Sequence, residues 1–146
     1  MDRYSHAMRL ELTRRGDYAV RAMLALAATG DDRPVSVRRI AEAMAIPAPI
    51  LPSVMRELVR AGLAEAIAGR AGGYRLARTP PEVNLLEIVE AIEGDTRRLR
   101  CVLRGGPCGR DGHCTVHDVF YAAQEAIRTE LGSATLDQLT SGLMSP

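Results

Sequence analysis

The sequence predicts a mainly α-helical protein with one short β-hairpin and a long helix near its C-terminus. Apolar residues recur at spacings of three and four through most of the chain, which is the helical pattern. The stretch 63–77 breaks this pattern and has two strand-like runs around a glycine-rich turn. The chain of 146 residues has no tryptophan and one phenylalanine, Phe120, so we expect an aliphatic core. This length fits one domain with an appended element.

Three helices are expected before the hairpin. The first covers 13–29, where apolar residues follow the helical spacing. Ser36 is a typical N-cap for a second, short helix at 37–45. After a proline-rich turn, a third helix follows and ends at Ala61. Two short helices joined by a three- to four-residue turn have the size and spacing of a helix-turn-helix.

The hairpin follows the third helix directly. Residues 63–67 and 73–77 flank the glycine-rich tip 68–72. A helix-turn-helix followed by such a hairpin is a winged helix. Arg70 lies on the tip, where an arginine is well placed to enter the minor groove of DNA. The alternative is a plain hairpin exposed to solvent.

The C-terminal part contains two more substantial helices. Asn84 and Glu87 form a capping-box-like start for a helix that ends at Gly94. A long amphipathic helix is expected at 115–131, and its narrow stripe suits either packing on the domain or a helix–helix dimer contact. The stripe consists of Val116, Phe120, Ala123, Ile127 and Leu131. A last helical turn is expected at 133–139, with fraying from residue 140 onward.

These elements divide the chain into four parts. They are a flexible leader (1–7), a winged helix-turn-helix DNA-binding domain (8–80), a region with the cysteine loop and dimerisation helices (81–140), and a flexible tail (141–146). The predicted architecture is thus a winged helix-turn-helix domain followed by a long C-terminal dimerisation helix.

All three cysteines lie in one glycine-rich segment. Six residues separate Cys101 from Cys108, and five separate Cys108 from Cys114. Glycine and proline disfavour a helix or strand interior, so this segment is expected to be a flexible loop. Three soft ligands with His117 close by suggest a metal or an iron–sulfur cluster. The alternative is three unrelated cysteines in a surface loop.

Charge and composition favour a nucleic-acid-binding protein over a membrane protein or an enzyme. Residues 1–78 carry 13 arginines and 8 acids, a net +5, whereas residues 79–146 carry 6 arginines and 10 acids, a net −4. A basic N-terminal half points to nucleic-acid binding there. No apolar run reaches membrane-spanning length and no signal peptide is evident, so we expect a cytoplasmic protein with reduced thiols and no membrane partner. No catalytic triad, phosphate loop or carboxylate pair stands out, which argues against an enzyme.

Several stretches, in this order, resemble one family of bacterial regulators. They are Met8-Arg-Leu, Gly16-Asp-Tyr-Ala-Val, Arg60-Ala-Gly-Leu, Gly69-Arg-Ala-Gly-Gly-Tyr-Arg-Leu-Ala, Leu85-Leu-Glu-Ile-Val-Glu-Ala-Ile-Glu-Gly94, the three spaced cysteines and Thr135-Leu-Asp-Gln-Leu. Together they resemble the iron–sulfur winged-helix transcriptional regulators that include IscR, NsrR and RirA. The resemblance implies a dimeric DNA-binding repressor or activator whose affinity is set by an iron–sulfur cluster or by thiol chemistry.

The resemblance also implies a set of cluster ligands. Cys101, Cys108 and Cys114 match the family's cluster cysteines in number and order, although the first gap is one residue longer than in IscR and NsrR. His117 matches the position where an IscR-like protein places a histidine beside a [2Fe–2S] cluster. Asp17 matches the aspartate that an NsrR-like protein lends from the other subunit to a [4Fe–4S] cluster. We favour His117 and [2Fe–2S], because His117 requires nothing from the partner chain. The alternatives are a surface imidazole for His117 and an acid favoured by the helix dipole for Asp17.

The expected second helix of the helix-turn-helix departs from the family pattern. Pro52 and Ser53 stand where an IscR-like protein has glutamate and glutamine. Base contacts are therefore expected from Ser53 and Arg56. Phosphate contacts are expected from Ser36, Arg38 and Arg39. Arg70, the expected wing contact, lies two positions beyond the family's usual place, so the operators of relatives do not transfer to this chain.

The sequence as a whole predicts a homodimer that reads a pseudo-palindromic DNA operator. An iron–sulfur cluster would control its affinity in response to redox, nitric oxide or iron status. One alternative keeps the DNA binding but uses thiol oxidation or zinc without a cluster. Another is an iron–sulfur electron-transfer or assembly protein, which would have no use for a helix-turn-helix and an arginine-bearing wing.

Overall fold

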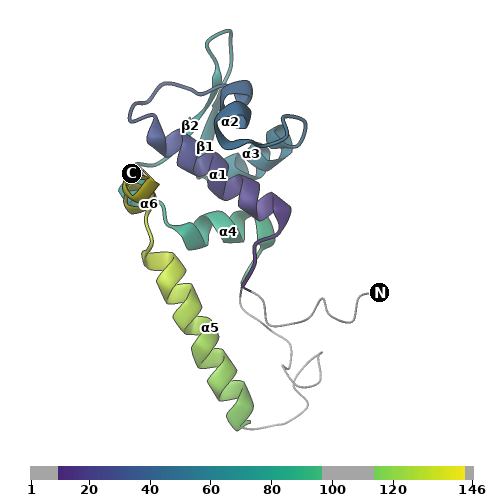
Figure 1. Ribbon diagram of the computed structural model, residues 1–146, viewed down its shortest axis with the longest axis vertical. Helices are drawn as coiled ribbons and strands as arrows, with labels where there is room; N and C mark the ends of the chain where they lie inside the picture. Colours follow the sequence, from purple (N-terminus) through teal and green to yellow (C-terminus); the bar gives the residue numbers. More distant parts are fainter. Residues whose placement is uncertain (1–9, 97–113, 144–146) are drawn as a thin grey trace.

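The computed structural model describes residues 10–96 and 114–143. These ranges form six α-helices, one 3₁₀ helix and a two-stranded antiparallel sheet (Figure 1). In chain order the elements are α1 (Arg14–Ala28), α2 (Val37–Met44), α3 (Leu51–Arg60), β1 (Ala64–Ile67), β2 (Gly73–Leu76), η1 (Pro80–Glu82), α4 (Leu85–Glu93), α5 (Thr115–Ser133) and α6 (Leu136–Leu143). We refer to all of them except α5 as the head. The mainly helical fold with a small hairpin is confirmed.

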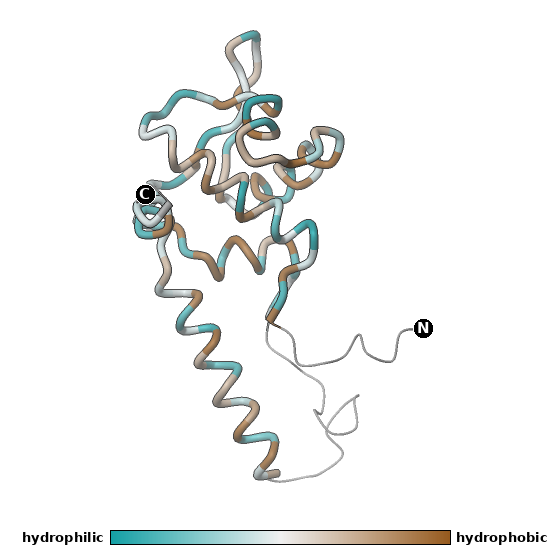
Figure 2. Tube along the Cα trace, viewed as in Figure 1, coloured by the Kyte–Doolittle hydropathy of each residue, from teal (hydrophilic) through white to brown (hydrophobic). Residues whose placement is uncertain are grey.

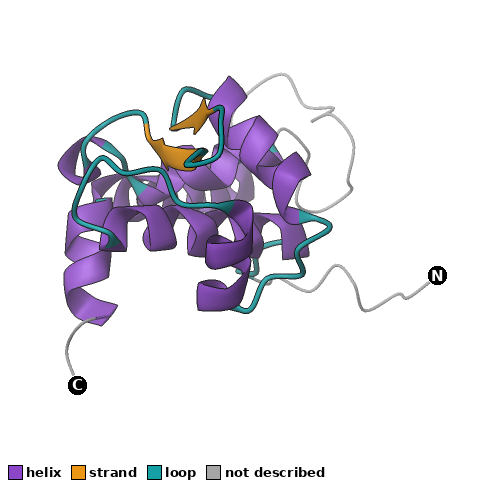
Figure 3. Cartoon of the chain, turned by 90° about the horizontal axis from the view of Figure 1, so that it is seen from above, coloured by secondary structure: helices purple, strands orange, loops and turns teal. Residues whose placement is uncertain are grey.

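One aliphatic core holds the head together. α1 runs through its middle and packs against α2, α3, α4 and α6, and the hairpin sits at one end (Figures 1 and 3). The largest fully buried side chains are Met23, Ile40, Leu51, Met55, Leu58, Leu63, Ile88 and Leu136. They come from five helices and from the residue before β1, so all five α-helices of the head and the base of the hairpin contribute to the same core.

α2 and α3 form the helix-turn-helix predicted from the sequence. Ser36 caps α2, because its Oγ accepts a hydrogen bond from the backbone N–H of Arg39 at 3.2 Å. The left-handed backbone of Ala45, with φ of 52°, ends the helix. Ile46 then anchors the turn in the core with 4% of its surface exposed. This turn sets the start of α3.

The hairpin is fixed to the head by a third extended segment. β1 and β2 pair antiparallel, with Ile67 opposite Gly73. Val35 adds to this sheet through two backbone hydrogen bonds with Tyr74, of 2.7 and 2.8 Å. A Cβ at Gly73 would lie 2.3 Å from the Val35 carbonyl oxygen, so only glycine allows this approach. The base of the wing therefore has a defined position relative to α2.

α5 leaves the head, and α6 returns to it. α5 has no buried residue and extends away from the head, with hydrophobic and hydrophilic residues interspersed along it (Figures 1 and 2). The chain then comes back: Leu136 donates a backbone hydrogen bond to the Val83 carbonyl at 2.9 Å, and its side chain is fully buried. None of the helices in the described ranges is long and apolar enough to cross a membrane.

The C-terminal end differs from the sequence-based expectation. A helical turn was expected at 133–139 with fraying beyond it, but the helix α6 continues to Leu143. Thr140 and Ser141 stabilise this extension, because their hydroxyls donate to backbone carbonyls of the preceding turn at 2.8 Å. The predicted leader at 1–7 and the last three residues lie outside the described residues.

Candidate DNA interface and cysteine site

α3 presents arginines on its exposed side. Leu51, Val54, Met55 and Leu58 face the core, which turns Arg56 and Arg60 outward. Neither arginine forms an ion pair or a side-chain hydrogen bond with another residue of the described ranges. Such guanidinium groups are free to bind phosphates or the edges of bases.

The residues at the start of α2 divide into one structural and two exposed positions. The hydroxyl of Ser36 is used as the helix cap. Arg38 pairs with Glu42 at 3.0 Å, but both side chains are well exposed, so this pair contributes little and can open toward a phosphate. Arg39 is exposed and has no ion-pair partner among the described residues.

Ser53 is already engaged within the head. It lies half-buried in the first turn of α3, and its hydroxyl donates to the Ile50 carbonyl at 3.0 Å. The same oxygen accepts a hydrogen bond from Arg15 Nη1 at 2.9 Å, and Arg15 Nη2 lies 3.0 Å from Glu57 Oε1. Any base contact from Ser53 would have to share or replace the hydrogen bond from Arg15.

Arginines of the hairpin differ in their availability. Arg70 is exposed at the tip and pairs with no other described residue. Arg75 pairs across the strands with Glu65 at 3.0 Å, and Arg78 pairs with Glu87 at the start of α4 at 2.9 Å. The two paired arginines therefore stabilise the base of the wing, and Arg70 is the hairpin arginine without an ion pair to a described residue.

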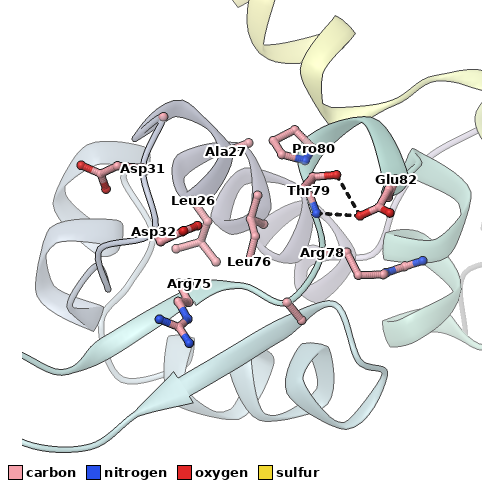
Figure 4. A pocket seen from close by; sticks show the side chains of 12 residues that line it. Leu26, Ala27, Asp31, Asp32, Arg75, Leu76, Arg78, Thr79, Pro80 and Glu82 are labelled. Carbon is pink, nitrogen blue, oxygen red and sulfur yellow. Dashed lines mark hydrogen bonds between the residues drawn. The ribbon is translucent and has the colours of Figure 1, made fainter.

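A pocket of about 340 Å³ lies at the base of the wing, between the end of α1, β2 and η1 (Figure 4). Its apolar wall includes Leu26 and Leu76. Of its charged groups, Arg75 and Arg78 are paired with carboxylates and Glu82 is hydrogen-bonded to Thr79. Glu82 accepts hydrogen bonds from the hydroxyl and backbone N–H of Thr79 at 2.8 and 3.0 Å, and these bonds lower its pKa. The pocket thus supports the wing and presents no unpaired site residue from the sequence prediction.

Sequence reasoning missed one arginine of this surface. Arg60 follows Arg56 by one helical turn and is exposed like it. This spacing of four residues could have identified Arg60 from the sequence.

The cysteine site is described at one of its three expected thiols. Cys114 is half-exposed at the N-cap of α5. His117 lies three residues later in the first turn, is exposed, and stacks on Tyr121 with ring centroids 6.3 Å apart. Cys101 and Cys108 lie outside the described residues. Within the described ranges no three histidine, cysteine or acidic side chains gather as metal ligands.

Asp17, the alternative ligand, is held by an arginine. Its two carboxylate oxygens accept from Arg21 Nε and Nη2 at 3.1 and 2.6 Å. Arg21 also donates to the Met44 carbonyl at the end of α2, at 2.7 Å, and lies over the ring of Tyr18. Asp17 therefore helps to fix α1 against α2.

One carboxylate holds the start of the segment that leads to the cysteines. Glu90 on α4 accepts hydrogen bonds from the backbone N–H and the hydroxyl of Thr96, at 3.1 and 2.8 Å, and also from Arg128 on α5. Burial alone would raise the pKa of Glu90, but the hydrogen bonds from Thr96 and Arg128 outweigh it and hold the pKa below its usual range. This cluster joins α4, α5 and the entry to the cysteine segment.

Comparison with known proteins identifies a family that shares this architecture. The Rrf2 family profile, described as "Iron-dependent Transcriptional regulator", matches residues 12–142. The chain is 32% identical over 130 residues to the HTH-type transcriptional regulator IscR of Xenorhabdus nematophila, covering 89% of this chain and 79% of that protein. It is 29% identical over 130 residues to protein rrf2 of Nitratidesulfovibrio vulgaris, covering 89% and 87%.

Solved structures agree with this assignment. CymR, the global cysteine regulator of B. subtilis, superposes with a TM-score of 0.79 at 25% identity, covering 91% of this chain and 98% of that one. IscR of T. potens superposes with a TM-score of 0.76 at 28% identity, covering 93% and 90%. The chain therefore belongs to the Rrf2 family of DNA-binding transcriptional regulators.

Proposed function

We propose that this protein is a homodimeric regulator that binds a pseudo-palindromic operator in the cytoplasm, with an affinity set by its cysteines. The observation that carries the DNA-reading part is a set of exposed arginines on the helix-turn-helix and the wing that form no ion pair with any described residue: Arg39, Arg56, Arg60 and Arg70. Other arginines of the head, namely Arg21, Arg75 and Arg78, are paired with carboxylates. Unpaired arginines on one functional unit favour a polyanionic partner.

Each DNA-facing residue has a distinct proposed role. Arg56 contacts base edges from α3, with Ser53 beside it, because α3 occupies the recognition position of the helix-turn-helix. Arg38 and Arg39 bind phosphates, and Ser36 holds the backbone N–H groups of α2 in place. Arg70 enters the minor groove from the wing tip.

The proposed dimer contact is the apolar stripe of α5. Phe120 and Ile127 have 37% and 40% of their surface exposed, and Val119 on the same side has 67%. A continuous exposed apolar face of this kind is characteristic of a helix that packs against a partner. A two-fold contact along α5 would place two heads on the two halves of an operator.

The proposed cofactor is an iron–sulfur cluster held by Cys101, Cys108, Cys114 and His117, with [2Fe–2S] favoured over [4Fe–4S]. The described residues fit such a group. Cys114 and His117 occupy neighbouring positions at the N-terminus of α5, where the helix dipole favours the negative charge of a thiolate-bound cluster. When bound, the cluster would supply sensitivity to oxidants, nitric oxide or iron supply. Asp17 is the weaker candidate, since ligation would compete with its two hydrogen bonds from Arg21.

A second candidate keeps DNA binding and replaces the cluster with thiol chemistry. The fold similarity to CymR, named as a global cysteine regulator, favours considering it. In this version Cys101, Cys108 and Cys114 would respond through reversible oxidation or zinc binding.

Two measurements test the proposed function. Native mass spectrometry and iron and sulfide analysis of anaerobically purified protein should give a dimer with one cluster per subunit. His117→Ala should lose the cluster and Asp17→Asn should keep it, with Ser133→Ala as a control on α5. A dimer without iron after anaerobic reconstitution would favour the second candidate, in which the cysteines respond through thiol chemistry.

The DNA-binding part is tested by selecting duplexes from a randomised library. The protein should recover an inverted repeat, and failure to enrich any sequence would contradict operator reading.

A further inference from the structure

The first turn of α1 is held by a residue that lies 80 positions later in the chain. Glu93, the last residue of α4, accepts a hydrogen bond from the backbone N–H of Thr13 at 2.6 Å. A negative charge is unfavourable at the C-terminus of its own helix α4 but favourable at the N-terminus of α1. Gly16 is buried against it, and a Cβ there would lie 2.5 Å from Glu93 Oε1. Glycine at position 16 leaves this space to the Glu93 carboxylate, and Figure 1 shows the two helix ends side by side.

The same turn of α1 holds the recognition helix. Arg15 reaches α3 with both terminal nitrogens, contacting Ser53 Oγ at 2.9 Å and Glu57 Oε1 at 3.0 Å. Ser53 and Glu57 are four residues apart and lie one above the other on one face of α3. A planar guanidinium that binds two such groups fixes the rotation of α3 about its axis as well as its distance from α1. Arg56 projects from an adjacent side of α3, so this rotation decides where Arg56 points.

We propose that the first turn of α1 is a joint through which α4 sets the rotation of α3 in the DNA groove. Arg15 is a positioning residue for DNA reading, acting through Ser53 and Glu57, and Glu93 acts through the turn that carries Arg15. This inference rests on the proposed operator-reading function.

Contacts on α4 also connect this first turn of α1 to the cysteine segment and to α5. Glu90 lies one turn before Glu93 on α4 and holds Thr96, from which the chain continues toward the cysteines, and Arg128 of α5. A displacement of this end of α4 would move the α1 turn, and Arg15 would carry the movement to α3. This contact route gives the cysteine segment and the dimer helix a physical connection to the DNA-reading surface.

The test separates positioning from direct DNA contact. The probes are a duplex recovered by the wild-type protein from a randomised library and a scrambled duplex of the same length, each titrated over a range of salt concentrations. Arg15→Ala should lower the ratio of specific to non-specific affinity by about tenfold while leaving the salt slope unchanged. Arg15→Lys should lose specificity in the same way, because lysine keeps the charge without the two-pronged donor. Arg14→Ala is the matched control for loss of one charge from the same turn, and it should leave the specificity ratio unchanged.

Glu93 is tested by a double-mutant cycle. Glu93→Ala should lower the specificity ratio by less than Arg15→Ala does, and the double variant should match Arg15→Ala because the two residues act in series. A purely structural role would lower the melting temperature and the active fraction without changing the specificity ratio of the active protein, which would overturn the proposal.

Three other results would also overturn it. A salt slope reduced by about one in Arg15→Ala, with Arg15→Lys behaving as wild type, would make Arg15 a phosphate contact. Additive effects of Arg15→Ala and Glu93→Ala on the specificity ratio would show that Glu93 does not act through Arg15. Failure to recover any duplex with the wild-type protein would overturn operator reading, and the positioning role with it, whereas the first two results leave operator reading intact.

Discussion

The head and α5 use their apolar residues in opposite ways. In the head, side chains as large as Met23 and Leu58 are fully buried in one core. On α5 no residue is buried, and Val119 has 67% of its surface exposed. The head thus contains within one chain the contacts that stabilise it, whereas the apolar face of α5 is left exposed by the residues that the structure describes. α5 is the part of the molecule whose environment is expected to change on association.

The connection between these two regions includes an ion pair and a backbone pairing. α5 meets α4 through Arg128 and Glu90, and the chain beyond α5 is joined to α4 by the backbone pair of Asn84 and Thr135. Hydrogen bonds and ion pairs of this kind orient two elements without large burial, so they can be rearranged at small cost. The head is expected to stay folded while the direction of α5 responds to its partner and to the cysteine segment.

The largest expected effect comes from placing a charge on the apolar face of α5. Ile127→Asp should weaken the dimer by about 3 kcal/mol or more, over a hundredfold in its dissociation constant, because two copies of the side chain leave the contact. Sedimentation at several concentrations measures this. Ala122→Asp, an exposed position on another side of α5, should leave association nearly unchanged. Equal weakening by both substitutions would place the dimer contact elsewhere.

The next effect tests whether α6 belongs to the head. Leu136→Ala should lower the free energy of unfolding by about 2–5 kcal/mol, because the side chain is fully buried and its removal leaves a cavity. Leu12→Ala is the matched control, since Leu12 has 42% of its surface exposed and its truncation should cost far less. Denaturant unfolding gives both values. A small effect at Leu136 would mean that α6 detaches easily, like α5.

Local patterns in the sequence predicted the elements of the head well. Periodicity located α1 to α4, and the caps at Ser36 and Asn84 are formed by the side chains expected. The structure gives the mainly helical fold with its wing, as predicted, because these signals act between residues within one or two turns.

Contacts between distant residues were beyond the reach of the same reasoning. Arg15 was not singled out, because its partner Glu57 is 42 residues away and only the packing of α1 on α3 brings them together. The burial of Leu136 likewise depends on backbone pairing with Val83. Of the predicted site residues, Arg39, Arg56 and Arg70 lie exposed and unpaired within the described residues. Ser53 has a distant partner, Arg15, that no sequence pattern shows, whereas Asp17 pairs with Arg21 four residues later on the same helix.

A moderate effect is expected at the start of α4. The Asn84 side chain accepts from the Glu87 N–H at 3.0 Å, and Glu87 accepts from the Asn84 N–H at 3.2 Å. Asn84→Ala should therefore cost about 1 kcal/mol of unfolding free energy, and Asn84→Ser only a few tenths, since serine keeps a capping oxygen. Because α4 is part of the head core, the loss should appear as a lower stability of the whole head. A selective loss of α4 in hydrogen exchange would contradict this.

The smallest effect concerns the polar connection between α5 and the head. Glu90→Gln should cost about 1 kcal/mol or less at neutral pH, because Glu90 and Arg128 are still 26% and 20% exposed. The pKa of Glu90 is lowered in the folded protein, so its contribution is present above the ordinary glutamate pKa of about 4.3 and is lost as the pH falls through the lowered value. The difference in unfolding free energy between wild type and Glu90→Gln should therefore hold from neutral pH down to about pH 4 and shrink below it.

Arg128 supplies the control for this pH dependence. In an Arg128→Gln background the Glu90→Gln difference should become smaller at neutral pH, because one of the groups that hold the carboxylate charged is gone. The cost of Leu136→Ala, by contrast, should not follow this acid transition, since that side chain is buried among apolar residues. A Glu90→Gln difference that stayed constant into strong acid would mean that the carboxylate charge does not hold α5 to the head, and that the backbone pairing near Thr135 alone sets their connection.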